Sequence, residues 1–329
     1  MSNAFIKDLT ERIISAPDTG ATEAEAIMIA ALPETELPEL LACANTVTAA
    51  CAGGDFFTCT IINAKSGRCS QDCAFCAQSA RHVTGVSVYP LLRKTEMLAR
   101  ALEMERINAT HFSMVTSGPR LNDDEIDIIC DTAADILAKT RLAICCSLGM
   151  ITARQAEKLR QSGVTRYHHN LETARSFFSE ICTTHDYDED IDTLKTAEAA
   201  GLSVCSGGIM GLGESWQQRV ELAFTLKLLN VSRIPINFLN PIAGTKLARQ
   251  PLLSPLEALK SIALFRFIHP MADITICGGR EPTLKDFQSW VFTAGANGLM
   301  IGNYLTTQGR DLAADLEMIN AWRRLRARP

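Results

Sequence analysis

The sequence lacks several features that would point to particular classes of protein. Its 329 residues carry a formal net charge of only −5, and no block of Lys or Arg stands out. A nucleic-acid partner would need a basic face, so none is expected. No run of about 18 apolar residues occurs, so no membrane span is predicted. The first residues lack a basic stretch followed by an apolar core, so we expect a cytoplasmic protein without a secretory signal.

Aromatic residues are also few, at 6%, within a composition of 47% apolar and 21% charged residues that is typical of a globular enzyme. Against this background the 12 cysteines are many. In a reducing cytoplasm, clustered cysteines are more often metal ligands or catalytic groups than disulfides. Scattered cysteines are more often small buried hydrophobic residues. This second interpretation applies to four that lack a partner at ligand spacing: Cys43, Cys51, Cys130 and Cys182.

The order of segments predicts a (β/α)8 barrel of the TIM type. Residues 1–54 form an expected helical extension, in which Pro33 and Pro38 separate two short helices. Residues 55–310 alternate strand-like and helix-like segments, and residues 311–329 form an expected C-terminal helix. A doubly wound open sheet is the alternative. The eight predicted strands are 58–64, 110–116, 142–148, 164–170, 202–208, 234–239, 273–279 and 298–302.

Alternation along these strands predicts which side chains face the barrel interior. In DITIC, Ile274 and Ile276 share one face, which leaves Thr275 and Cys277 on the other. The same reading of the other strands predicts an interior too polar and too rich in sulfur for a purely structural core. Its members on four strands are Ser113, Cys145, Cys205 and Cys277.

The clearest motif is RCSQDCAFCAQ, in which Cys69, Cys73 and Cys76 have the spacing C-x3-C-x2-C directly after the first strand. Three thiolates can bind three irons of a 4Fe–4S cluster and leave the fourth iron open for S-adenosylmethionine (SAM). The alternatives are a chance arrangement or a structural zinc site. Zinc normally takes four protein ligands, and His82 is the only nearby candidate for a fourth.

These motifs resemble those of biotin synthase, a family within the radical SAM superfamily, from about residue 55 to 310. SGRCSQDCAFCAQSA resembles the cluster loop of that family, YHHNLET its strand-four motif and VCSGGIMGLGE its strand-five motif. IPINFL, GGRE, AGAN and LTT continue the match in the same order. The resemblance implies a radical SAM sulfurtransferase that inserts sulfur into dethiobiotin. It also implies a homodimer, and an electron donor such as a flavodoxin or ferredoxin.

The resemblance also implies roles for individual residues. It places the SAM-cleaving 4Fe–4S cluster on Cys69, Cys73 and Cys76. Four residues match positions near SAM: Phe75, Asn170, Glu172 and Ile209. Four match substrate contacts: Asn170, Asn237, Thr306 and Thr307. Taken singly, the amides could be core residues and the threonines an ordinary helix cap.

The sequence departs from the family at its second cluster, which is usually a 2Fe–2S cluster held by three cysteines and an arginine. Cys145 and Cys205 match two of those cysteines, but Ser113 replaces the third and Thr275 replaces the arginine. A neighbouring arginine position holds His111. Because Cys277 is predicted to face the same way as Thr275, our hypothesis is an altered auxiliary cluster on Cys145, Cys205 and Cys277. Three thiolates suit a 4Fe–4S type with one iron free to carry a donated sulfide.

Three functions therefore stay open from the sequence. The first is biotin synthase with a variant sulfur-donating cluster. The second is a radical SAM enzyme that acts on another small molecule without inserting sulfur, with an auxiliary site that is dead or holds no metal. The third is a zinc-stabilised binding protein. In either radical SAM function the cofactors carry the difficult chemistry, so His168 and His169 are expected to pack or to form hydrogen bonds rather than act as bases.

Overall fold

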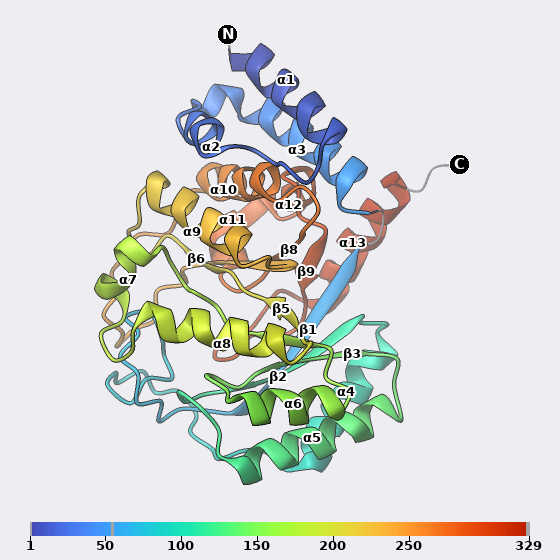
Figure 1. The fold of residues 1–329 in the computed structure, drawn as a ribbon, viewed down its shortest axis with the longest axis vertical. Helices are drawn as coiled ribbons and strands as arrows, with labels where there is room; N and C mark the ends of the chain where they lie inside the picture. The colour runs from blue at the N-terminus through green and yellow to red at the C-terminus, as the bar shows by residue number, and fades with distance from the viewer. Residues whose placement is uncertain (1, 54–55, 327–329) are drawn as a thin grey trace.

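The computed structural model describes residues 2–53 and 56–326 and shows a closed barrel of parallel strands (Figure 1). The strands are hydrogen-bonded in the order β5-β4-β3-β2-β1-β9-β8-β7-β6, and a β5–β7 pairing closes the ring. Closure excludes the open sheet. The strands are β1 (Phe57–Lys65), β2 (His111–Thr116), β3 (Ala143–Ser147), β4 (Arg166–His168), β5 (Ser203–Cys205), β6 (Gly208–Met210), β7 (Arg233–Phe238), β8 (Asp273–Ile276) and β9 (Gly298–Met300).

Each of the eight predicted segments contains a strand, and one of them is interrupted. The fifth wall of the barrel consists of β5 and β6, which are separated by Ser206 and Gly207. At Gly207 the backbone passes so close to β7 that a Cβ atom would lie 1.9 Å from the carbonyl oxygen of Pro235. A glycine is therefore required where the chain breaks the ladder.

Helices cover the outside of the barrel. They are α4 (Lys94–Arg106), α5 (Asp123–Leu137), α6 (Ala153–Gln161), α7 (Arg175–Ile181), α8 (Tyr187–Ala199), α9 (Trp216–Leu228), α10 (Pro255–Ile268), α11 (Arg280–Leu284) and α12 (Trp290–Thr293), with 3-10 turns η1 (Glu34–Glu36) and η2 (Lys285–Phe287). Capping boxes begin several of them. At α5, for example, the Asn122 side chain accepts from the Glu125 N–H.

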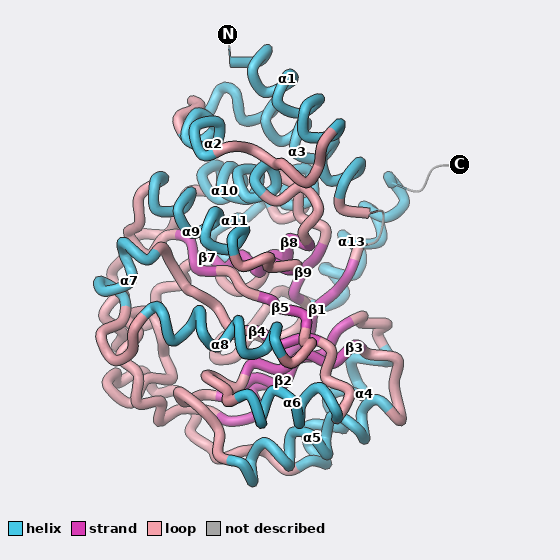
Figure 2. The backbone as a smooth tube through the Cα atoms, in the orientation of Figure 1, coloured by secondary structure: helices cyan, strands magenta, loops and turns pink. Residues whose placement is uncertain are grey.

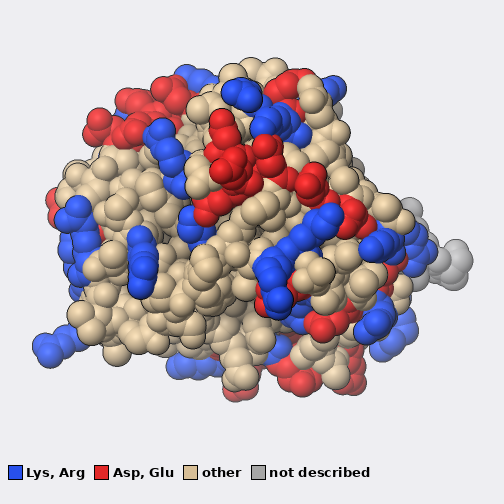
Figure 3. Space-filling model, turned by 90° about the horizontal axis from the view of Figure 1, so that it is seen from below, with Lys and Arg blue, Asp and Glu red and all other residues tan. Residues whose placement is uncertain are grey.

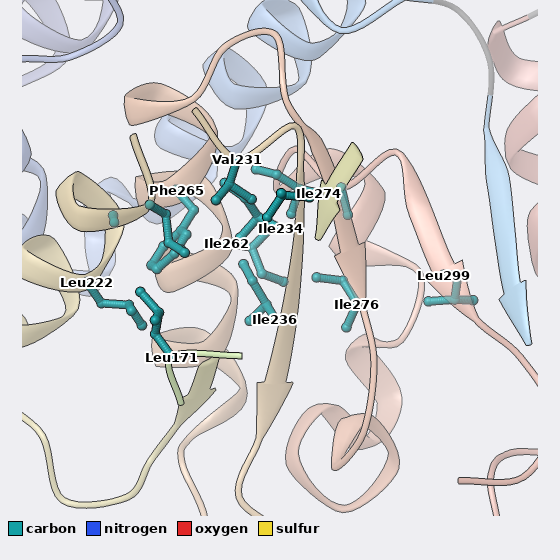
Figure 4. Packing of buried hydrophobic residues seen from close by; sticks show 14 of the residues in the cluster. Leu171, Leu222, Val231, Ile234, Ile236, Ile262, Phe265, Ile274, Ile276 and Leu299 are labelled. Atoms are coloured by element: carbon teal, nitrogen blue, oxygen red, sulfur yellow. The ribbon is translucent and has the colours of Figure 1, made fainter. Parts of the chain in front are cut away.

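The outward faces of the strands form the core with these helices. Figure 4 shows this packing at β7 and β8, where Ile234 and Ile274 lie close to Ile262 and Phe265 of α10. All four are fully buried. The outward side chains are thus apolar, as the alternation predicted, and the inward ones are left to form a site.

Additional helices lie at both ends of the chain. α1 (Ser2–Ser15), α2 (Glu23–Ala30) and α3 (Leu37–Cys51) stack beyond α10 at the top of Figure 1. The sequence predicted α2 and α3 within its helical extension but did not single out α1. At the C-terminus, α13 (Leu312–Arg326) packs Trp322 on Phe292, with ring centroids 5.2 Å apart. Within 2–53 and 56–326, no helix combines the length and apolar character needed to cross a membrane.

Candidate active site

A cavity of about 400 Å³ occupies the barrel interior. It extends from the N-terminal ends of the strands to the loops at their C-terminal ends, where barrel active sites are built. These long loops, pink in Figure 2, gather on one side of the molecule. Most of the predicted site residues line this single cavity: Phe75, Cys76, Cys145, Asn170, Glu172, Cys205, Ile209, Asn237, Cys277, Thr306 and Thr307.

The three-cysteine loop follows β1 and is folded back on itself by backbone hydrogen bonds. The Cys69 N–H donates to Gln78 at 3.0 Å, and the Cys76 N–H donates to Cys73 at 2.9 Å. The Gln78 side chain accepts from the Ser66 hydroxyl at 3.0 Å, which ties the loop to the end of β1. All three cysteines are half-buried and free of disulfides. The loop thus gathers three thiols at the C-terminal rim of the barrel.

Cys182, which the sequence suggested was only a packing residue, lies beside this loop. Its Sγ is 3.9 Å from Cys73 Sγ and 3.1 Å from His185 Nδ1. The hydrogen bond from Cys73, together with that from His185, lowers the pKa of Cys182 to about 4. Sequence spacing gave no signal for this contact, because Cys182 is more than 100 residues away along the chain.

Of the predicted SAM residues, Phe75 precedes Cys76 on the loop, and the other three lie on the strand-four and strand-five motifs and line the same cavity. The Asn170 amide donates to the Glu172 carboxylate at 3.2 Å and accepts from the Gly207 N–H at 3.1 Å. The Ile209 N–H donates to the Glu172 carbonyl at 2.8 Å, which joins the two motifs. Burial raises the pKa of the Glu172 carboxyl to about 8. Phe75 and Ile209 pack against a small apolar cluster of Ile181, Leu212 and Leu239.

The predicted substrate residues line the same cavity. Asn237 on β7 accepts from the Gly278 N–H at 3.0 Å and donates to the Gly208 carbonyl at 3.3 Å. Those bonds fix the orientation of the amide. The segment with Thr306 and Thr307 is tied to β1 by the Asn63 amide, which donates to the Leu305 carbonyl at 3.0 Å.

The deep part of the cavity is lined by thiols. Cys145, Cys205 and Cys277 all face it, as predicted, whereas Cys146 is buried on the helix side. Ser203 shares the face of Cys205 but is exposed at the end of its strand. The sequence missed a fourth thiol, Cys59 on β1. Its neighbours Thr58 and Thr60 share the opposite, buried face, so the strand lacks the apolar alternation that would have identified Cys59.

Basic side chains lie among these thiols and toward the N-terminal ends of the strands. Arg233 Nη1 is 4.0 Å from Cys59 Sγ, and His168 Nδ1 is 3.4 Å from Cys205 Sγ. Burial, and then the nearby arginines, lower the pKa of His111 to about 4, so this imidazole is neutral near pH 7. Among the cavity-lining groups, Thr275 Oγ1 and Arg166 Nε are buried without a hydrogen-bond partner in the described part of the chain. A polar, electron-rich group fits a cavity that leaves such donors unsatisfied.

A zinc site is not supported by this arrangement. No three His, Cys, Asp or Glu side chains among residues 2–53 and 56–326 are grouped closely enough to hold one metal ion. His82, the proposed fourth ligand, has its Nδ1 2.9 Å from the Cys76 carbonyl oxygen. An iron–sulfur cluster differs in this respect. Its thiolates bind different irons, so they need not lie close enough to bind one ion.

Comparisons with known proteins agree with the class of enzyme that the cysteine loop predicts. The family model of the radical SAM superfamily matches residues 64–226, and that of the biotin and thiamin synthesis associated domain matches residues 235–323. Among solved structures, methylornithine synthase has a TM-score of 0.82 at 17% identity, covering 95% of this chain and 96% of its own. The FeFe-hydrogenase maturase HydG from Carboxydothermus hydrogenoformans has a TM-score of 0.78 at 17% identity, covering 96% and 79%. At such identities the likeness concerns the fold alone. With the cysteine loop, the fold defines a radical SAM enzyme, a class that uses a 4Fe–4S cluster and SAM.

The sequence relatives are more specific. The biotin synthase of Syntrophus aciditrophicus is 53% identical over 319 residues, which cover 97% of this chain and 98% of that protein. The biotin synthase of Oleidesulfovibrio alaskensis is 50% identical over 312 residues, covering 95% and 96%. The chain belongs to the biotin synthase family.

Proposed function

We propose that the chain converts dethiobiotin to biotin by radical SAM sulfur insertion. The observation that carries this proposal is the continuous cavity that joins Cys76 of the loop, the polar groups at mid-depth and the thiols at the bottom. A hydrogen-abstracting radical and a sulfur source must act on one substrate. A single continuous cavity with both kinds of ligand at opposite ends meets that requirement.

Cys69, Cys73 and Cys76 hold the SAM-cleaving cluster in this proposal. When bound, the cluster and SAM supply a 5′-deoxyadenosyl radical that can take hydrogen from an unactivated carbon. Asn170 and Glu172 present oxygen acceptors to the ribose hydroxyls, and the protonated form of Glu172 can also donate. Phe75 and Ile209 offer an apolar surface to the adenine and exclude water from it.

The substrate residues bind the two ends of dethiobiotin. Asn237 can donate and accept hydrogen bonds, which suits the ureido ring, and two backbone contacts hold its amide in place. Asn170 also reaches the substrate. Thr306 and Thr307 supply hydroxyl and backbone N–H donors for the carboxylate without a buried lysine.

An auxiliary iron–sulfur cluster on Cys145, Cys205 and Cys277 is the proposed source of sulfur. With Ser113 and Thr275 in place of the usual cysteine and arginine, the site does not match the 2Fe–2S type. These three thiols, and the arginines nearby, favour a different cluster of higher nuclearity.

Partners beyond the substrate belong to the proposal as well. We expect an electron donor such as a flavodoxin or ferredoxin, and a homodimer. Nucleic acid is not expected. On the face drawn in Figure 3, basic and acidic side chains are interspersed and no continuous basic stripe crosses it.

An anaerobic assay with dethiobiotin, SAM and a reductant tests the function. The expected products are 5′-deoxyadenosine and biotin, and both are expected to be lost in Cys73→Ala. The replacements at Ser113 and Thr275 favour one alternative, a radical SAM enzyme for another small molecule. Formation of 5′-deoxyadenosine without biotin would support that alternative and contradict the proposal.

A further inference from the structure

Cys59 faces the cavity that Cys145, Cys205 and Cys277 line, and strand register shows how it lies relative to them. In a TIM-type barrel the strands are tilted relative to the barrel axis. Residues at the same height along that axis are therefore not register partners: the residue at equal height lies about one position further along the chain for each strand crossed. Cys59 pairs with His111, which pairs with Ala143. Two positions beyond Ala143 is Cys145. Cys59 and Cys145 therefore lie at the same level on alternate strands.

The same step can be continued around the ring. From Cys145 it leads through the β4 and β5 pairings to Cys205, and from there through β7 and β8 to Thr275. From Thr275 it leads through β9 back to Cys59. The path closes on itself, as a layer of four inward residues from alternate strands should. Three of the four members of this layer are cysteines.

Cys277 lies outside the layer, two residues beyond Thr275 and nearer the substrate side. Its neighbour Gly278 donates its N–H to Asn237. Cys59 is thus a closer geometric counterpart of Cys145 and Cys205 than Cys277 is.

Two thiols of the layer have an arginine as register partner on the adjoining strand. Cys145 pairs with Arg166, and Cys205 pairs with Arg233. Arg233 in turn lies 4.0 Å from Cys59 Sγ. The two guanidinium groups place positive charge directly below the thiols, where thiolates bound to iron would carry negative charge.

We propose that Cys59 is a ligand of the auxiliary iron–sulfur cluster, together with Cys145 and Cys205 at its own level and Cys277 on the substrate side. This inference rests on the auxiliary cluster of the proposed function. It adds a β1 residue to a site that the sequence had placed on β3, on β5 and just after β8. With four thiolates no iron of a 4Fe–4S cluster would be left free, so the donated sulfur would be one of its bridging sulfides.

The test uses full-length protein in which Cys69, Cys73 and Cys76 are replaced by alanine, so that only the auxiliary cluster remains. Anaerobic reconstitution with iron and sulfide is followed by metal counting, Mössbauer spectra and EPR of the reduced protein. About four irons per chain are expected. Adding Cys59→Ala should lower the bound iron at least about twofold. Cys59→Ser should keep more iron but change the spectra, because oxygen would replace a sulfur ligand.

The matched control is Cys146→Ala, which removes a buried thiol from β3 that faces the helices rather than the cavity. It should leave iron content and spectra unchanged. Circular dichroism of each metal-free variant separates loss of a ligand from loss of the fold. Unchanged iron and spectra in both Cys59 variants would overturn the inference and leave the auxiliary cluster intact. Absence of iron in the starting triple variant would overturn the auxiliary cluster itself, and the role of Cys59 with it.

Discussion

Two carboxyl groups near the cysteine loop are held in opposite protonation states. Burial raises the pKa of Glu172 to about 8. Burial also acts to raise the pKa of Asp72, but hydrogen bonds from Thr183 and neighbouring donors outweigh it and hold that pKa well below its usual range. Asp72 accepts from the Thr183 N–H at 2.8 Å and from its hydroxyl at 2.7 Å. Glu172 therefore faces the cavity as a neutral acid, while Asp72 joins the loop to the segment after α7 as an anion.

Glu172 should make the stability of the ligand-free protein depend on pH. The folded protein keeps the proton to a higher pH than the unfolded chain, whose pKa is near 4.5. Stability should therefore fall as pH rises from about 4.5 to about 8. Glu172→Gln should remove this slope and add roughly 1–3 kcal/mol at pH 8. Denaturant unfolding at several pH values measures this dependence of the free energy of unfolding on pH. Glu180→Gln, at an exposed site on α7, is the control, and an equal effect there would contradict the assignment.

Asp72→Ala should destabilise the loop. It leaves the Thr183 N–H without its acceptor, a loss of about 1–3 kcal/mol. The stabilisation that Asp72 provides is present above its unfolded pKa and is lost as the pH falls below that value. Unfolding at neutral pH and the rate of iron loss to a chelator both report the effect. Asp188→Ala, which breaks an exposed pair with Arg175, should cost at most about 1 kcal/mol. A similar small loss for Asp72→Ala would argue against the role of this carboxylate.

At the scale of residues, the sequence identified Cys145, Cys205 and Cys277 as facing the barrel interior because they alternate with apolar neighbours. It did not identify Cys59, because the alternation on its strand is not apolar. It also did not identify Cys182 or Arg233, which contact distant segments, and a single sequence carries no local pattern for such contacts.

At the level of elements, the interruption between β5 and β6 positions the strand-five motif. Ser206 and Gly207 leave the ladder, and the chain resumes with β6 against the Glu172 carbonyl. The sequence predicted a strand over 202–208 because its residues are apolar and β-branched in part. It could not predict the break, since the need for it arises from the approach of Pro235 on β7.

Gly207→Ala should test this close approach. The added Cβ would meet the Pro235 carbonyl at 1.9 Å, and backbone atoms cannot move aside as a flexible side chain can. We expect a loss of about 3 kcal/mol or more in unfolding experiments. Gly85→Ala is the control. No atom lies within 4 Å of its Cβ position, so only its positive φ should matter, at about 1 kcal/mol. Equal losses of stability in the two variants would show that the contact with β7 does not cause the destabilisation.

For the molecule as a whole, the barrel was predictable because eight apolar strands alternate with amphipathic helices. The attachment of the C-terminal helix was not, because it depends on a buried ion pair between residues 35 positions apart. Arg280 and Asp315 are fully buried and lie 2.8 Å apart, which joins α11 to α13. Arg310 also contacts Asp315, at 3.2 Å. These pairs anchor the segment that follows β9, which contains Thr306 and Thr307.

Asp315→Ala should therefore weaken both the fold and the proposed binding site for the substrate carboxylate. Removing Asp315 takes away the fully buried partner of Arg280 and leaves that guanidinium with Glu281 alone, at 3.3 Å, at a cost of about 3 kcal/mol. The affinity for dethiobiotin, measured by calorimetry below the melting temperature, should fall as the Thr306 segment loses its anchor. Asp286→Ala, at an exposed position in η2, should change neither quantity. Normal affinity in folded Asp315→Ala protein would show that the segment is held by other contacts.

The continuous cavity also imposes an order on assembly. The thiols of β1, β3 and β5 lie at its depth, and the loop with Cys76 lies at its rim. If the auxiliary cluster is bound as proposed, iron and sulfide for the bottom would pass that rim, and so would any refill after sulfur had been consumed. Maturation would then be a sequence in time, with the inner site loaded before the outer one is finished and each repair repeating that order.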